Sequence, residues 1–270
     1  SNHEAKNISF AALILSVFSF TSFLLGLLRD RLITGSFGVG NELDTYYTAF
    51  RIPDFIAMVL MTGAIGVAVI PIFTKNLIKD KEQAFKYVSN FLNIVLVALI
   101  IICGILFIFT PQLISIIAPG FTPEKKEITS LLTRIMFLSP ILMGISNINS
   151  AILRVFHKFL ITALAPVFYN LGSVVGIVFF VPKMGITGLA WGIVLGAFLH
   201  LIIQIPALFK TGFRIQKIFN FKDPNFLLTA KLTIPRAIGL AATQVNLVIV
   251  TIIGSTLVQG SIGIFSLAND

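Results

Sequence analysis

The chain has 270 residues, of which 56% are hydrophobic and 11% charged, and its mean hydropathy is +0.97. Soluble globular domains carry about 25% charged residues, so this composition excludes an ordinary soluble domain and indicates an all-α polytopic membrane protein. The formal charge of +9 is accounted for by Lys and Arg in cytoplasmic loops and by attraction to anionic membrane lipids, so we expect no nucleic-acid partner.

Eight apolar runs are predicted, and the first seven are long enough for a transmembrane helix, which needs about 20 apolar residues. In chain order these seven are Ser9–Leu28, Asp44–Phe73, Asn90–Ile117, Ile128–Leu153, Leu160–Val181, Ile186–Phe209 and Asn225–Leu257. The eighth run begins near Ser261, and we expect the protein to continue past Asp270 inside that helix.

Lys and Arg are unequally distributed between the connections on the two sides of these spans. Twelve of them lie in the connections on one side, with Lys6 and the cluster from Lys75 to Lys86 among them, and five lie on the other. Because cytoplasmic loops carry the excess of Lys and Arg, this asymmetry predicts a cytoplasmic N-terminus.

A basic and aromatic segment, residues 210–224, separates the sixth span from the seventh. We expect it to lie on the lipid headgroups as an interfacial linker. Asp223 and Pro224 have the residue types of an N-cap and a first helical position, so they predict the start of the seventh helix. The predicted organisation is therefore a six-helix lobe (1–209), the linker (210–224) and the start of a second lobe (225–270).

Five charged residues interrupt the apolar sequence between the first and second spans, in the order Arg29, Asp30, Asp44, Arg51 and Asp54. A charge inside a bilayer costs roughly 2.5–3.5 kcal/mol, so such residues usually face a partner or a water-filled cavity. Arg51 and Asp54 are three residues apart and share a helical face, which fits either an internal ion pair or a cavity lining. A guanidinium binds phosphate oxygens in a bidentate manner, so Arg29 and Arg51 are candidates for an anionic substrate.

Other polar residues support alternative interpretations. Asp44 could equally be the N-cap of the second helix. Arg134 and Arg236 lie near the ends of their spans, where a long side chain can reach the headgroups. His200 is expected to make a hydrogen bond between helices, and Cys103 to be a small core residue. The sequence contains no metal-ligand spacing and no catalytic signature, so we predict no metal, no cofactor and no enzyme activity.

Short motifs follow one another along the whole chain. They are Gly26–Asp30, Ala49–Pro53, Val69–Pro71, Ala118–Phe121, Thr133–Met136, Ala165–Val167 with Asn170, Gly188–Gly192 and Gln204–Pro206. In this order they resemble the MurJ/MviN lipid II flippases, of the same MOP superfamily as the MATE exporters. The resemblance implies fourteen helices in two lobes, alternating access, and cavity arginines that engage a diphosphate. This chain would then be the six-helix N-lobe of a MATE-like two-lobe transporter, helix seven and part of helix eight.

The chain departs from the family pattern at several positions where members often have a charged or polar residue: Phe23, Ala57, Met58, Thr62, Val250 and Asp270. Members often have arginine at the positions of Phe23 and Asp270. Of the diphosphate-binding arginines Arg29 is kept, and Arg51 matches a basic position. Because each charge-assisted contact contributes roughly 1.5–3 kcal/mol, losing three cations should weaken the binding of an anion.

The resemblance implies a flippase that moves lipid II across the bacterial cytoplasmic (inner) membrane. Arg29, Asp30, Asp44, Arg51 and Asp54 are then the expected substrate-binding residues, with Arg134, Arg236 and Asp270 as secondary candidates. The expected partners are lipid II, anionic lipids and cell-wall synthesis proteins. Alternatives are an exporter of another polyprenyl-diphosphate glycan or of a small cation, which the acidic residues would suit, and a transport-inactive membrane scaffold.

Overall fold

The structure, a computed structural model, describes the backbone of residues 2–59 and 68–269, and their side chains apart from those of residues 2–12 and 14. All the regular structure in this part of the chain is helical. The helices are α1 (Asn2–Phe37), α2 (Asn41–Ala57), α3 (Ile70–Lys79), α4 (Lys81–Ile108), α5 (Thr110–Ile117), α6 (Pro123–Met136), α7 (Leu138–Val155), α8 (Phe159–Val175), the π-helix η3 (Gly176–Phe180), α9 (Val181–Met184), α10 (Thr187–Ile202), α11 (Ile205–Lys210), α12 (Pro224–Ser255) and α13 (Ser261–Asn269).

The all-helical membrane architecture predicted from the apolar runs is confirmed. Within the described residues, five helical stretches are long and apolar enough to cross a membrane: Lys81–Ile108, Pro123–Val155, Phe159–Met184, Thr187–Lys210 and Pro224–Ser255. They overlap the third to seventh predicted spans, the third beginning and ending nine residues earlier than predicted. The first predicted span lies inside α1, while the second begins in α2, ends in α3 and has its middle outside the described residues.

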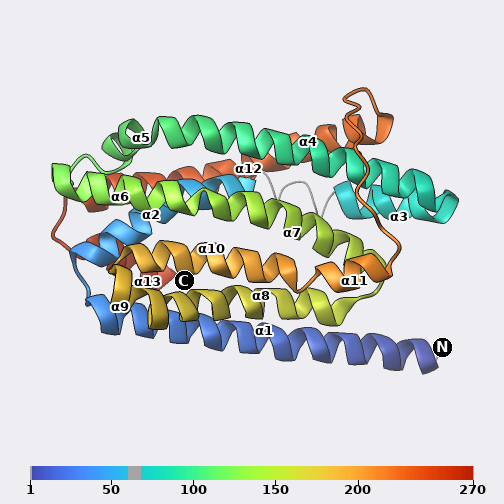
Figure 1. Cartoon of the computed structure of the whole chain (residues 1–270), viewed down its shortest axis with the longest axis horizontal. Helices are drawn as coiled ribbons and strands as arrows, with labels where there is room; N and C mark the ends of the chain where they lie inside the picture. The colour runs from blue at the N-terminus through green and yellow to red at the C-terminus, as the bar shows by residue number, and fades with distance from the viewer. Residues whose placement is uncertain (1, 60–67, 270) are drawn as a thin grey trace.

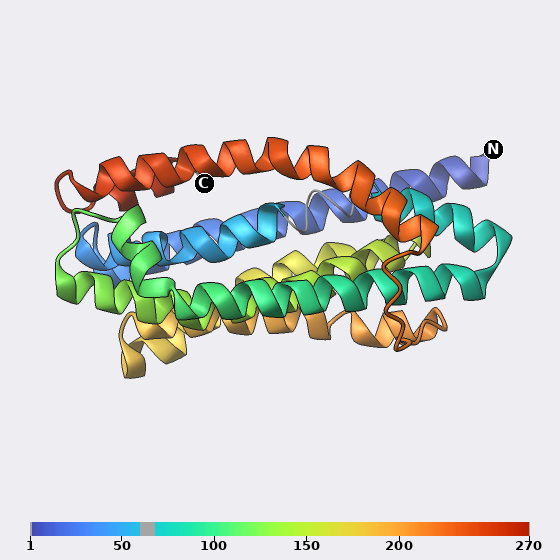
Figure 2. The same ribbon diagram turned by 90° about the horizontal axis from the view of Figure 1, so that it is seen from above.

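The helices form an elongated bundle in which most of them run along its length (Figure 1). α8 packs between α1 and α10, and α2 packs on α6 and α7. α12 follows one face of this bundle over nearly its full length (Figure 2). Few of its side chains are buried, and Gln244 and Thr251 are among those few. Within this chain, the long apolar helix α12 therefore exposes most of its surface.

The start of α12 agrees with the cap predicted from the sequence. The Asp223 carboxylate accepts the backbone N–H of Phe226 at 2.8 Å, and Pro224 is the first helical residue. The preceding linker is bound to α4, since the side chain of Asn90 exchanges two hydrogen bonds with the backbone of Asn220, at 2.9 and 2.6 Å. A side chain of α4 thus holds the backbone of the linker in place.

Glycines allow the close approach of α8 and η3 to α10. A Cβ added to Gly176 would lie 2.3 Å from the Cα of Gly192, and one added to Gly172 would lie 2.5 Å from the Cα of Gly196. Small residues at membrane helix interfaces let the two backbones pack directly against each other. Through these contacts, α10 packs on α8 and η3, and α8 in turn packs on α1.

Candidate functional site

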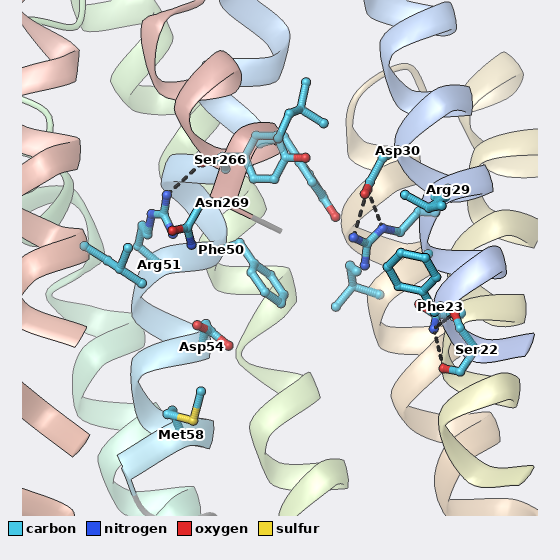
Figure 3. A pocket seen from close by; sticks show the side chains of 18 of the residues that line it. Ser22, Phe23, Arg29, Asp30, Phe50, Arg51, Asp54, Met58, Ser266 and Asn269 are labelled. Carbon is cyan, nitrogen blue, oxygen red and sulfur yellow. Dashed lines mark hydrogen bonds and ion pairs between the residues drawn. The ribbon is translucent and has the colours of Figure 1, made fainter. Parts of the chain in front are cut away.

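A cavity of about 510 Å³ lies between α1 on one side and α2, α12 and α13 on the other. This volume is in the range of ligand-binding pockets. Of the five expected substrate-binding residues, four line it: Arg29, Asp30, Arg51 and Asp54. Figure 3 shows Arg51 and Asp54 on α2, across the cavity from Arg29 and Asp30 on α1.

Arg29 and Asp30 form an ion pair at the cavity wall. Both Nε and Nη2 of Arg29 contact Oδ1 of Asp30, at 2.9 and 2.8 Å. The two side chains retain 20% and 16% exposure, so water or a ligand in the cavity can reach them. The carboxylate of Asp30 holds the guanidinium in place, because two nitrogens on one edge of the guanidinium contact it.

Arg51 joins α2 to the two helices that follow the linker. Its Nε donates to Oγ1 of Thr251 on α12 at 3.1 Å, and its Nη2 donates to Oγ of Ser266 on α13 at 2.8 Å (Figure 3). Asp54 is three residues further along α2 and lines the same cavity. Arg51 therefore serves as both a cavity residue and a bridge between α2 and the α12–α13 pair.

Asp44 does not line the cavity. Its side chain is 3% exposed, and its two carboxylate oxygens accept the backbone N–H groups of Gly260 at 2.8 Å and Gly263 at 2.9 Å. Lys125 on α6 contacts the same carboxylate at 3.4 Å. Asp44 thus caps α13, whereas the sequence suggested a cavity residue or the cap of its own helix. The N-cap of α2 is Gly40, which has no side chain to act as a cap.

The secondary candidates lie elsewhere or are not described. Arg134 packs on α4, where its Nε donates to the carbonyl of Phe107 at 3.2 Å. Arg236 is exposed on α12, one residue after Pro235, and is not among the residues that line the cavity. Asp270 lies outside the described residues.

The cavity also includes residues that were not predicted as site residues. Asn170 on α8 donates to the carbonyl and the hydroxyl of Ser22 on α1, at 3.0 and 2.9 Å, and Gln244 and Asn269 contribute further amides. Each is a polar side chain in a largely apolar span, which is the signal that could have identified it.

Two of the departures from the family pattern, Phe23 and Met58, line the cavity as well. Figure 3 shows Phe23 with the α1 residues and Met58 at the end of the α2 row. Apolar side chains therefore form part of the cavity wall at these two positions. Among the described residues, no group of three or more His, Cys, Asp or Glu residues could hold a metal ion.

Comparison with known proteins places the chain in one family. Residues 33–270 match the family described as lipid II flippase MurJ. The chain is similar to the "Probable lipid II flippase MurJ" of Buchnera aphidicola subsp. Acyrthosiphon pisum, with 31% identity over 92% of this chain and 49% of the relative. It is also similar to the "Lipid II flippase MurJ" of Burkholderia cenocepacia, with 26% identity over 95% and 51%.

Solved structures agree with this assignment. The structure titled "Lipid II flippase MurJ, inward closed conformation" superposes with a TM-score of 0.79 at 27% identity, over 95% of this chain and 54% of that one. A MATE transporter superposes with a TM-score of 0.69 at 17% identity over 97% and 60%, which shows a shared fold alone. The chain spans about half the length of the curated relatives it matches. This bacterial multi-pass membrane protein belongs to the MurJ lipid II flippase family and has the helical fold of MOP-type transporters.

Proposed function

We propose that this chain is the first half of a flippase that moves lipid II across the bacterial cytoplasmic membrane by alternating access. The observation that carries the proposal is the central cavity, in which Arg29 and Arg51 lie on opposite walls within the fold of this family. A diphosphate entering between them would meet a guanidinium on each side. Charge-assisted hydrogen bonds of this kind contribute roughly 1.5–3 kcal/mol each.

The acidic residues of the cavity have a supporting role in this proposal. Asp30 orients Arg29 through the paired contacts at 2.8 and 2.9 Å, so the guanidinium is positioned before the substrate arrives. Asp54 keeps the local charge of α2 balanced when the cavity holds only water. The protein's part is binding and movement, and we assign no catalytic step to any residue.

Alternating access requires the helices around the cavity to separate on one side. At the end of the bundle where α2 begins, two contacts hold α12 and α13 to the earlier helices. Asp44 binds the start of α13, and Gly120 binds the end of α12. The backbone N–H of Gly120 donates to the Ser255 hydroxyl at 3.2 Å, next to the turn between α12 and α13. We infer that opening of the cavity toward this end requires both contacts to break.

The lobe organisation is part of the same proposal. Residues 1–209 would form the first lobe, 210–224 the linker, and 225–270 the start of the second lobe. The distribution of Lys and Arg supports a cytoplasmic N-terminus, and the linker, with four basic residues from Lys210 to Lys222, would then face anionic lipids of the inner leaflet.

Complementation tests the proposal. The full-length product of the gene that encodes this chain would be expressed in bacteria depleted of their own lipid II flippase. Growth and the exposure of lipid II at the outer leaflet would be measured for the unmodified protein, for Arg29→Ala and for Arg31→Ala. Arg31 is the matched control, since it is an exposed arginine on the same helix that does not line the cavity.

We expect the unmodified protein and Arg31→Ala to restore lipid II exposure, and Arg29→Ala to lower it at least tenfold at equal membrane abundance. Normal exposure with Arg29→Ala would refute the assigned role of the cavity. A protein that reaches the membrane without restoring exposure would point to another polyprenyl-diphosphate glycan or to a role without transport.

A further inference from the structure

A second concavity, of about 550 Å³, lies on the outside of the bundle between α4 and the helices α6, α7 and α10. We call it the outer groove. Its walls are almost entirely apolar, with Ile100, Gly104, Phe107, Leu138 and Trp191 among its residues. It shares no residue with the central cavity. Because α4, α6–α7 and α10 belong to predicted membrane spans, an apolar chain from the bilayer is the natural occupant of such a groove.

One end of the outer groove is cationic. Arg134 lines both this groove and an adjoining concavity of about 600 Å³, which also includes Lys126, Glu127 and Ser130. Two cations and one carboxylate leave this end with a net charge of +1. Such an end attracts a phosphate whose headgroup carries no compensating ammonium.

The guanidinium of Arg134 is held in position but not neutralised. Its Nε donates to the carbonyl of Phe107, and its central carbon lies 5.2 Å from the centroid of the Phe107 ring. Within the described part of the chain, no carboxylate lies within ion-pair distance of Arg134 or of Lys126. A guanidinium has five N–H donors, and here only one of them has a protein acceptor. The remaining donors can bind phosphate oxygens in a bidentate manner.

We propose that the outer groove is a binding site for one anionic phospholipid, with an acyl chain along α4 and the phosphate on Arg134. The apolar walls and the cationic end are continuous at Arg134 and Leu131, which line both concavities. This matches the arrangement of a phospholipid, in which the phosphate follows directly on the acyl region. This lipid site is separate from the central cavity, and the proposal does not depend on the function proposed for the central cavity.

Trp191 makes the site measurable, because it is the single tryptophan of the chain and lines the outer groove. Bromine on an acyl chain quenches tryptophan fluorescence only at short range. The purified chain would be reconstituted in phosphatidylcholine vesicles that contain increasing fractions of either dibrominated phosphatidylglycerol or dibrominated phosphatidylcholine. The two quenching curves give the relative affinity of the anionic and the zwitterionic lipid for the surroundings of Trp191.

Two variants separate the phosphate contact from the acyl contact. Arg134→Gln removes the cation, and its control is Arg236→Gln on α12, which lies outside the groove. Gly104→Leu adds an apolar side chain to the wall of the groove, at a position where a Cβ meets nothing within 4 Å. Its control is Gly239→Leu, at an exposed helical glycine that has the same free space.

We expect phosphatidylglycerol to quench Trp191 with about fivefold higher affinity than phosphatidylcholine, the effect of roughly one cation on an anionic lipid. Arg134→Gln should abolish this preference, and Gly104→Leu should reduce quenching by both lipids, while the two controls behave like the unmodified protein. Equal quenching by the two lipids in the unmodified protein would overturn the proposal. A preference that survives Arg134→Gln, or quenching that Gly104→Leu leaves unchanged, would also overturn it.

Discussion

Asp44 on α2 and Gly263 on α13 are joined by a hydrogen bond of 2.9 Å, although 219 residues separate them in the sequence. The second carboxylate oxygen of Asp44 accepts the N–H of Gly260 at 2.8 Å, so one side chain satisfies two donors at the start of a helix. A negative charge at a helix N-terminus also interacts favourably with the helix dipole. This contact fixes α13 against α2.

We expect Asp44→Asn to lower the thermal stability of the protein. An asparagine has one acceptor oxygen, so the N–H of either Gly260 or Gly263 would face an amide NH₂ group instead of an acceptor. The loss should be roughly 1.5–3 kcal/mol, the usual contribution of a hydrogen bond to a charged group. Thermal unfolding in detergent, followed by circular dichroism, measures it. Glu42→Gln, at an exposed acidic residue on the same helix, should leave the transition unchanged, and an equal effect of both substitutions would contradict the capping role.

The anion affinity of the central cavity should rise when a cation is added at Phe23. This side chain lines the cavity and is 57% exposed, so an arginine at this position would bring a guanidinium to the cavity wall. Partial exposure weakens the contact by screening, so we expect Phe23→Arg to increase the affinity for farnesyl diphosphate by roughly threefold to tenfold. Thermophoresis of the purified protein measures this affinity.

Phe23→Gln is the matched control, because it adds polarity without charge at the same position. We expect it to leave the affinity for farnesyl diphosphate within twofold of the starting value. If Phe23→Arg binds the diphosphate no more tightly than Phe23→Gln, the cavity does not recognise the anion by charge.

The membrane spans could be predicted from the sequence because one physical requirement, about 20 apolar residues per crossing, dominates the pattern. The length of the apolar runs did not locate the breaks within the spans. The third span divides at Phe109, where Pro111 stands in the first turn of α5, and the fourth divides at Phe137, three residues before Pro140. Four of the five expected site residues were brought together because they lie on two adjacent helices. Asp44 was misplaced because its partners are backbone groups of α13, which no side-chain pattern marks.

A buried hydrogen-bond network joins α7 to the end of α10, as was expected for His200. The hydroxyl of Ser146 lies 2.6 Å from Nδ1 of His200, and Nε2 of Gln204 donates to the same hydroxyl at 2.7 Å. Oε1 of Gln204 accepts from Ser150 at 3.0 Å. These four buried side chains satisfy one another.

We expect Gln204→Leu to destabilise the protein by roughly 1–3 kcal/mol, because it leaves the buried hydroxyl of Ser150 without its acceptor. Thermal unfolding in detergent would show a lower midpoint, while Gln112→Leu, at an exposed glutamine of α5, should not lower it. An unchanged midpoint in Gln204→Leu would mean that water or a neighbouring backbone group replaces the amide.

The last prediction concerns glycine substitutions with opposite signs. Gly176→Ala should destabilise the protein by about 1–3 kcal/mol, because the new methyl group would lie 2.3 Å from the Cα of Gly192 and force η3 away from α10. Gly104→Ala should stabilise it by about 0.5–1 kcal/mol, since that position on α4 is helical and open and alanine favours the helix. The two unfolding midpoints, measured in the same detergent, should therefore shift in opposite directions from that of the unmodified protein. A Gly176→Ala midpoint that is not lowered would show that the backbones of η3 and α10 are not in direct contact.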